Sequence, residues 1–177
     1  EELKKIDGFL NIYSNDDDSV FFLKLDKEDL NEKFIYFSYV MNAPQGSTLT
    51  GGLPSDGKVY EFRSFKKDKI GLYQINTSYI KGDETNNIAK SSITNITEAF
   101  VEVFKPAART EDSVLINLNS IILSEKMDSI SYVPSEYREY ISVDYGMPDE
   151  AKTFVKNIYN NKTNTAFEVT FAFENFM

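Results

Sequence analysis

The stretch "GFLNIYSNDDDSVFFLKLDKEDL", residues 8–30, decides the expected fold of this chain. Two runs rich in Ile, Val, Leu and Phe, Ile6–Tyr13 and Val20–Leu25, flank a polar cluster of Asn, Asp and Ser. Apolar runs separated by turn-forming residues are typical of a β-hairpin. We therefore predict a strand, a turn and a second strand, followed by a short helical turn in "KLDKEDL" with Asp26 at its cap.

The acidic cluster Asn15–Ser19 between the two runs has two interpretations, a calcium loop or a hairpin turn. A calcium loop of the EF-hand kind needs six or more oxygen ligands, a Gly at its bend and a Glu at its end. This stretch has neither the Gly nor the Glu at that spacing. Asn and Asp favour turns because their side chains bond their own backbone, so we interpret the cluster as a solvated hairpin turn.

The same hairpin signal occurs twice more along the chain. Val59–Phe65 and Ile70–Ile75 flank a Lys-rich turn, and Thr153–Tyr159 and Thr165–Phe173 flank "NNKTN". Repeated hairpins favour antiparallel sheets. We predict an α+β fold that is mostly antiparallel β, a hairpin-rich sheet or sandwich with one or two short helices, in a single domain over residues 1–177.

Three further segments have less regular patterns. "KFIYFSYVM", residues 33–41, reads as a strand with bulky side chains on both faces: Phe34, Tyr36 and Val40 on one, Ile35, Phe37 and Tyr39 on the other. Strands that are apolar on both faces are usually covered on both, so we expect a cover for each face. "TNITEAFVEVF", residues 94–104, is the best candidate cover within the domain, as a short helix entering a strand. The alternative is a cover supplied by a separate domain, which would leave an exposed apolar patch on this one. "SVLINLNSIIL", residues 113–123, reads as one strand.

Composition excludes several classes of function. The chain has no Cys and no His, which rules out within it a Ser-His-Asp triad, a thiol nucleophile and any zinc site built on His or Cys. The net charge of -9 opposes binding to nucleic acid or to an anionic membrane. The sequence contains no run of about 20 apolar residues, the length that a helix needs to span a bilayer. We expect no catalytic residue, no cofactor and no metal site in this chain.

Two groups of residues remain as candidates for function. The first is a possible interaction surface made of tyrosines, which offer rigid contact area with a polar tip: Tyr36, Tyr39, Tyr132, Tyr137, Tyr140 and Tyr145. For the last four we favour the alternative, which is packing of a long irregular segment onto the sheet. The second group is the adjacent carboxylates Asp149 with Glu150 and Glu111 with Asp112, which could do glycosidase-like acid and base work. In a chain with 28 acidic residues such pairs also arise without purpose.

The order of these segments resembles a family of domains of unknown function. That family lies at the amino terminus of bacterial zinc-dependent metalloproteases of the gluzincin type. The resemblance rests on "GFLNIYSNDDDSVFFLKLDKEDLNEKFIYFSYV", on "GGLPSDGKVYEFRSFKKDKIGLYQIN", on "SITNITEAFVEVFKPAARTEDSVLINLNSIIL" and on the closing hairpin "KTFVKNIYNNKTNTAFEVTFAF". Together these stretches cover nearly the whole chain.

The resemblance implies a role outside catalysis. In such proteins the protease domain carries a HExxH helix, whose two His bind zinc while the Glu activates water. A chain without His resembles the upstream, non-catalytic part, which would support or shield a separate catalytic domain of the same parent chain. The resemblance also implies a periplasmic or extracellular location. A free-standing β module that binds peptide or glycan is the alternative.

Overall fold

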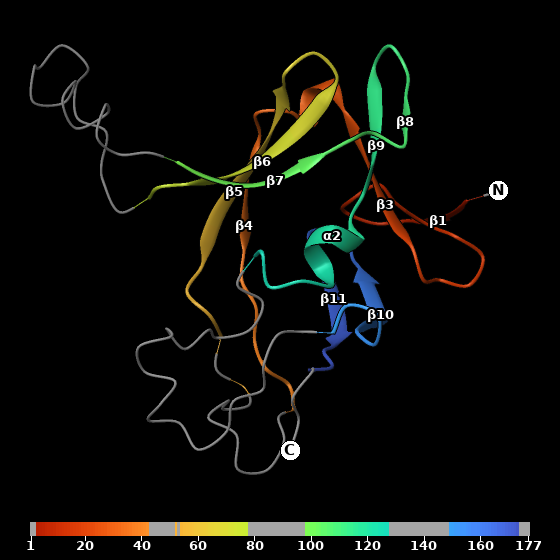
Figure 1. Cartoon of the computed structure of the whole chain (residues 1–177), viewed down its shortest axis with the longest axis vertical. Helices are drawn as coiled ribbons and strands as arrows, with labels where there is room; N and C mark the ends of the chain where they lie inside the picture. Colours follow the sequence, from red (N-terminus) through yellow and green to blue (C-terminus); the bar gives the residue numbers. More distant parts are fainter. Residues whose placement is uncertain (1–2, 43–51, 53, 78–97, 128–148, 174–177) are drawn as a thin grey trace, which may run out of the picture.

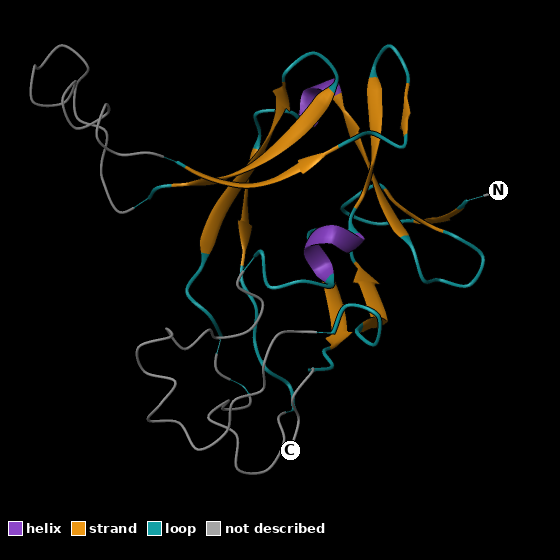
Figure 2. Cartoon of the chain, in the orientation of Figure 1, coloured by secondary structure: helices purple, strands orange, loops and turns teal. Residues whose placement is uncertain are grey.

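The computed structural model describes residues 3–42, 52, 54–77, 98–127 and 149–173 (Figure 1). Its strands are β1 (Lys4–Ile6), β2 (Ile12–Ser14), β3 (Phe21–Asp26), β4 (Lys33–Tyr36), β5 (Lys58–Phe65), β6 (Lys69–Ile75), β7 (Ala99–Phe104), β8 (Ala108–Arg109), β9 (Ser113–Asn117), β10 (Phe154–Asn160) and β11 (Thr165–Thr170). Two short helical elements accompany them, the 3-10 turn η1 (Lys27–Asp29) and α2 (Asn119–Ile122). Strands dominate the described part of the chain (Figure 2), which confirms the predicted antiparallel β fold with one or two short helices.

The strands form three antiparallel sheets. One sheet has the order β1-β2-β3-β9-β8, a second has the order β4-β5-β6-β7, and the hairpin β10-β11 stands as the third. Each of the three predicted hairpins is present, as β2-β3, β5-β6 and β10-β11. The single strand expected over Ile6–Tyr13 is wrong in part, because β1 ends at Ile6 and β2 begins at Ile12. Chain neighbours therefore pair along most of the fold, and the β3-β9 pairing joins segments distant in sequence.

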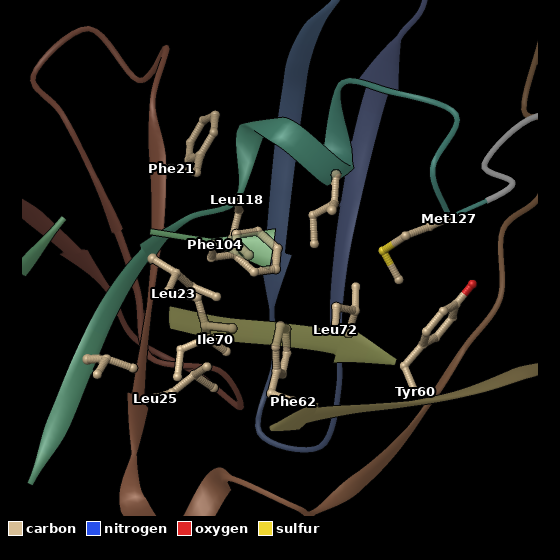
Figure 3. Packing of buried hydrophobic residues seen from close by; sticks show 13 residues of the cluster. Phe21, Leu23, Leu25, Tyr60, Phe62, Ile70, Leu72, Phe104, Leu118 and Met127 are labelled. Atoms are coloured by element: carbon tan, nitrogen blue, oxygen red, sulfur yellow. The ribbon is translucent and has the colours of Figure 1, made fainter. Parts of the chain in front are cut away.

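The hydrophobic core lies between the two larger sheets (Figure 3). Along β3 the burial alternates, with Phe21, Leu23 and Leu25 inward, as expected for a strand with one wet face. Strand β9 of the same sheet, the four-stranded sheet and the α2 region complete the cluster with Val114, Ile116, Tyr60, Phe62, Ile70, Leu72, Phe104, Leu118, Ile121 and Met127. The rings of Phe21 and Phe167, 6.5 Å apart, connect the third sheet to this core.

The amino-terminal hairpin is latched to the carboxy-terminal one through Asn160. Its Nδ2 donates to the carbonyls of Ile6 and Leu10 at 2.8 Å each, and its Oδ1 accepts from the backbone N–H of Leu10 at 3.2 Å. Gly8 lies against this side chain so closely that an added Cβ would come within 2.3 Å of Asn160 Cγ. Three hydrogen bonds from one amide therefore connect the two ends of the chain.

The predicted turns are also present. Asn15 Oδ1 accepts from the backbone N–H groups of Ser19 and Val20 at 2.9 and 2.8 Å, so the acidic cluster forms an Asx-type hairpin turn. Asp26 occupies the N-cap of η1, and its backbone N–H donates to Asp29 Oδ2 at 2.8 Å. These local signals come from side chains that bond the nearby backbone, which is why sequence alone located them.

Two secondary-structure predictions were wrong in part. The strand expected over residues 113–123 ends at Asn117, and α2 follows, with Asn117 Oδ1 accepting from the N–H of Asn119 at 2.8 Å. The segment Ala99–Phe104 is an edge strand, β7, and not a helix that covers the sheet. Residues 94–97, where the helix would begin, lie outside the described residues.

The expectation that the domain itself covers both faces of the 33–41 strand was also wrong. The division into two faces is correct, because Phe34 and Tyr36 are half-buried and contact the core ring of Tyr60, Phe34 stacked at 6.0 Å and Tyr36 edge to face at 5.8 Å between centroids. The opposite face, with Ile35 and Phe37, is exposed. The physical reason is that β7, the expected cover, lies in the plane of the same sheet, at the opposite edge from β4, and so covers neither face.

Candidate docking surface

A stripe of exposed apolar side chains runs along β4 and the segment that follows it. Its members recur at every second residue and are Ile35, Phe37, Tyr39 and Met41, exposed by 75%, 59%, 55% and 55%. Alternate residues of an extended chain point to the same side, so the four side chains share one face. We call these four residues the β4 stripe.

The backbone beyond β4 is held straight by an arm formed by residues 52 and 54–57. Tyr39 bridges Pro54, while the Ser38 carbonyl accepts from Ser55 N–H at 2.6 Å and the Val40 carbonyl accepts from Gly52 N–H at 2.7 Å. These bonds continue the ladder that β4 makes with β5. The stripe therefore sits on a paired, extended backbone and not on a free loop.

The stripe continues into the outer face of the four-stranded sheet. Ile35 lies opposite Val59, and Val59 lies opposite Ile75, which makes an aliphatic row across three strands. Further along, the rings of Tyr73 and Phe100 meet edge to face with centroids 4.9 Å apart. The outer face therefore carries aliphatic and aromatic side chains on several strands, which is uncommon for a wet sheet face.

A charged cluster lies on the same face beside the aromatic rings. Arg63 Nε donates to Glu61 Oε1 at 2.6 Å, and Arg63 Nη1 donates to Glu98 Oε2 at 2.5 Å. The guanidinium carbon also lies 4.8 Å from the ring centroid of Tyr73. The hydrogen bonds from Glu61 and Glu98 raise the pKa of Arg63 above its ordinary value. Because both carboxylates bind the same guanidinium, this cluster is suited to rigidity and poorly suited to proton transfer.

A shallow hollow of about 380 Å³ lies in the other large sheet. Tyr13, Lys24 and Arg109 line it together with Leu3 and Leu115. The Lys24 ammonium also pairs with Asp26 at 2.7 Å, and this carboxylate raises the pKa of Lys24. An aromatic ring next to hydrogen-bond donors is the kind of lining that sugars and peptide ends use.

The structure places the predicted surface tyrosines apart. Tyr39 is exposed on the β4 stripe, whereas Tyr36 points to the opposite face and packs on Tyr60. The predicted platform residues Tyr132, Tyr137, Tyr140 and Tyr145 lie outside the described residues. Sequence reasoning missed Ile35, Phe37 and Met41 as surface residues, although the lack of alternation in "KFIYFSYVM" was the signal that could have found them.

The candidate carboxylate pairs show no convergent arrangement. Asp149 pairs with Lys152 at 2.5 Å, and this contact lowers the pKa of Asp149. Asp112 is exposed and pairs with Lys27 at 3.1 Å. Among residues 3–42, 52, 54–77, 98–127 and 149–173, no group of three or more acidic side chains is arranged to hold a metal ion.

Comparisons with known proteins identify no relative of this chain. Neither protein-family models nor curated proteins nor solved structures give a match to this chain. No helix in the described part of the chain has the length and apolar character needed to cross a membrane. The exposed apolar face of β4 is thus the feature from which function is inferred.

Proposed function

We propose that this chain is a non-catalytic accessory module that docks another protein domain through the β4 stripe. The single observation that supports this proposal is the row of four large apolar side chains, each more than half exposed, on β4 and on the segment beyond it that pairs with residues 52, 54 and 55. Contiguous exposed apolar patches on soluble folds usually mark interaction sites. The charged residues that normally interrupt such a surface are absent from Phe34–Met41.

The resemblance of the sequence supports a more specific form of this proposal. In that form the module is the amino-terminal part of a bacterial, exported zinc metalloprotease-like protein, and it supports or shields a separate HExxH domain. The gene beyond Met177 is then expected to encode HExxH. The absence of His and Cys from this chain is consistent with a zinc site supplied entirely by another domain.

A hydrophobic dye tests the docking surface. At concentrations low enough for the chain to be a monomer, the chain should bind a dye such as anilinonaphthalene sulfonate. Phe37→Asp should reduce the dye fluorescence because it places a charge in the middle of the stripe. Tyr159→Asp is the matched control, since Tyr159 is an aromatic residue of similar exposure, 52%, on β10.

The loss of dye binding in Phe37→Asp, compared with that in Tyr159→Asp, decides whether the β4 stripe is the apolar surface. A larger loss of dye binding in Phe37→Asp than in Tyr159→Asp supports the stripe as the apolar surface. Equal dye binding in the parent chain and Phe37→Asp, with both folded by circular dichroism, would contradict the proposal.

The second candidate function is a free-standing module that binds peptide or glycan. The hollow lined by Tyr13, Lys24 and Arg109 favours this alternative, because it combines a ring face with two cationic donors. In that case Tyr13→Ala should abolish binding in a glycan or peptide array, whereas Phe37→Asp should leave it unchanged.

A further inference from the structure

We propose that the strand edge carrying the β4 stripe pairs with the same edge of a second copy of this chain, antiparallel along residues 33–41. This inference rests on the proposed function, because it names the partner of the same surface. The four-stranded sheets of two copies would join into one continuous sheet across a two-fold axis near Phe37. The stripe of each copy would then continue onto the stripe of the other.

The first argument is the direction of the backbone groups. β4 is the last strand of its sheet, and no described strand lies beyond it. The carbonyls of Ser38 and Val40 accept hydrogen bonds from the N–H groups of Ser55 and Gly52. Bonding alternates from one side of an antiparallel strand to the other, so the N–H and C=O groups of Phe37 and Tyr39 point to the free edge. A strand added there could bond them.

The second argument comes from comparing β4 with the other sheet edges. Natural edge strands are protected by charge, by bulges or by shortness. In this fold β1 carries Lys4 and Lys5, β7 carries Glu102 with a register shift opposite Leu72 and Tyr73, and β8 has only 2 residues. Phe34–Met41 contains no charge, no Pro and no Gly. Phe34–Met41 is therefore the longest uncharged stretch along an edge among the described strands of the two larger sheets, with Lys33 as the one charge of β4.

The third argument is self-complementarity. When two copies pair antiparallel about Phe37, Ile35 of one copy lies opposite Tyr39 of the other, and Phe37 lies opposite its own equivalent. Aromatic residues opposite aromatic or β-branched ones are favourable cross-strand pairs, each contributing roughly 0.2–1 kcal/mol. Lys33 falls opposite Met41, so no like charges meet along the seam.

The charge of the whole chain makes a seam without acidic residues important. Each copy carries a net charge of -9, so two copies repel each other at long range. The seam along residues 33–41 contains Lys33 and no acidic residue, so pairing brings no carboxylates together at short range. This segment is consequently a place where two such chains can approach.

Sedimentation velocity of the full chain over a wide concentration range tests the inference. The parent chain should show a concentration-dependent monomer–dimer equilibrium at low and moderate salt. Phe37→Lys and Phe37→Glu should each raise the dimer dissociation constant by at least about tenfold, because residue 37 meets its own equivalent and like charges oppose each other there. Tyr159→Lys is the matched control and should leave the dissociation constant unchanged.

Mixing the two charged variants gives the sharpest result. Phe37→Lys and Phe37→Glu should each be monomeric alone and should form a heterodimer when combined, since opposite charges then meet at the two-fold axis. Restored association in the mixture is expected only if residue 37 of one copy lies near residue 37 of the other. Ile35→Lys provides a second variant at a site that is 75% exposed, should either substitution at Phe37 disturb folding.

Three outcomes would overturn the inference. A chain that stays monomeric at every concentration, while Phe37→Asp still lowers dye binding, would reject the second copy and leave the docking module standing. A dimer that is insensitive to substitution of Ile35 and Phe37 would place the seam elsewhere. A mixture of the two charged variants that stays monomeric would reject the antiparallel register about Phe37.

Discussion

The strands β3 and β4 are both short and rich in Phe, yet their two faces have different surroundings. In β3 each apolar residue on one face is buried, and its other face carries half-buried residues such as Lys24 and Asp26. In β4 one face packs on Tyr60 and Phe62, while the other leaves Ile35 and Phe37 in solvent. β3 pairs with strands on both sides, and β4 pairs on one side.

A strand with large apolar side chains on both faces is expected to pack against two surfaces. The second of these surfaces can belong to another molecule. In β3 apolar and polar residues alternate, so a single core is enough to bury its apolar face. In β4 the outer face has no partner among the described residues other than its in-sheet neighbours such as Val59. We therefore interpret the unmatched face as a binding surface.

The largest expected effect comes from truncating matched positions on the two strands. Leu23→Ala, at a residue 2% exposed in β3, should lower the free energy of unfolding by about 2–5 kcal/mol through lost burial and a cavity. Phe37→Ala in the monomer should change it by no more than about 0.5 kcal/mol, because its side chain is mostly in solvent. Urea unfolding measured by circular dichroism compares them. A loss of similar size at Phe37 would show that the outer face of β4 is covered.

The second effect concerns alkaline pH and the inner face that β4 covers. Burial, with a smaller contribution from Tyr36, raises the pKa of Tyr60 to about 12. The unfolded pKa is about 10, so between these values the folded state holds more protons and stability falls as pH rises. The loss attributable to Tyr60 should approach about 3 kcal/mol by pH 12.

Tyr60→Phe isolates that contribution from other groups that titrate in the same range. The difference in unfolding free energy between the parent chain and Tyr60→Phe should change across pH 10 to 12 and stay constant at neutral pH. A difference that does not depend on pH would mean that the Tyr60 hydroxyl is solvated, and that Phe34 and Tyr36 do not shield it.

The smallest expected effect compares two glycines, one beside the packed region and one beside the open face. Gly8→Ala places a Cβ within 2.3 Å of Asn160, so the latch must shift, and stability should fall by about 1–3 kcal/mol. Gly57→Ala meets nothing closer than Ile35 Cγ2 at 3.9 Å and should have little effect. Thermal unfolding of both variants checks this. A larger loss in Gly57→Ala would show that the outer face near Ile35 is crowded.

Much of the fold could be predicted because its signals are local. The turn at Asn15–Ser19 and the η1 cap at Asp26 depend on side chains that bond backbone groups a few residues away. The short hairpins follow from apolar runs close together in the chain. The end of β9 at Asn117 was missed, because the apolar run continues through α2 and a buried helix turn has the same composition as a buried strand.

The amino-acid sequence by itself determined the antiparallel hairpins, the turns between them, the division of β4 into two faces and the impossibility of His or Cys chemistry within this chain. Only the tertiary structure decided that β3 pairs with β9, that β7 extends its sheet in plane, and that Ile35 and Phe37 face solvent. The physical reason is that hairpins and turns arise from interactions between near neighbours. Which face of a strand finds a partner depends instead on how distant segments pack.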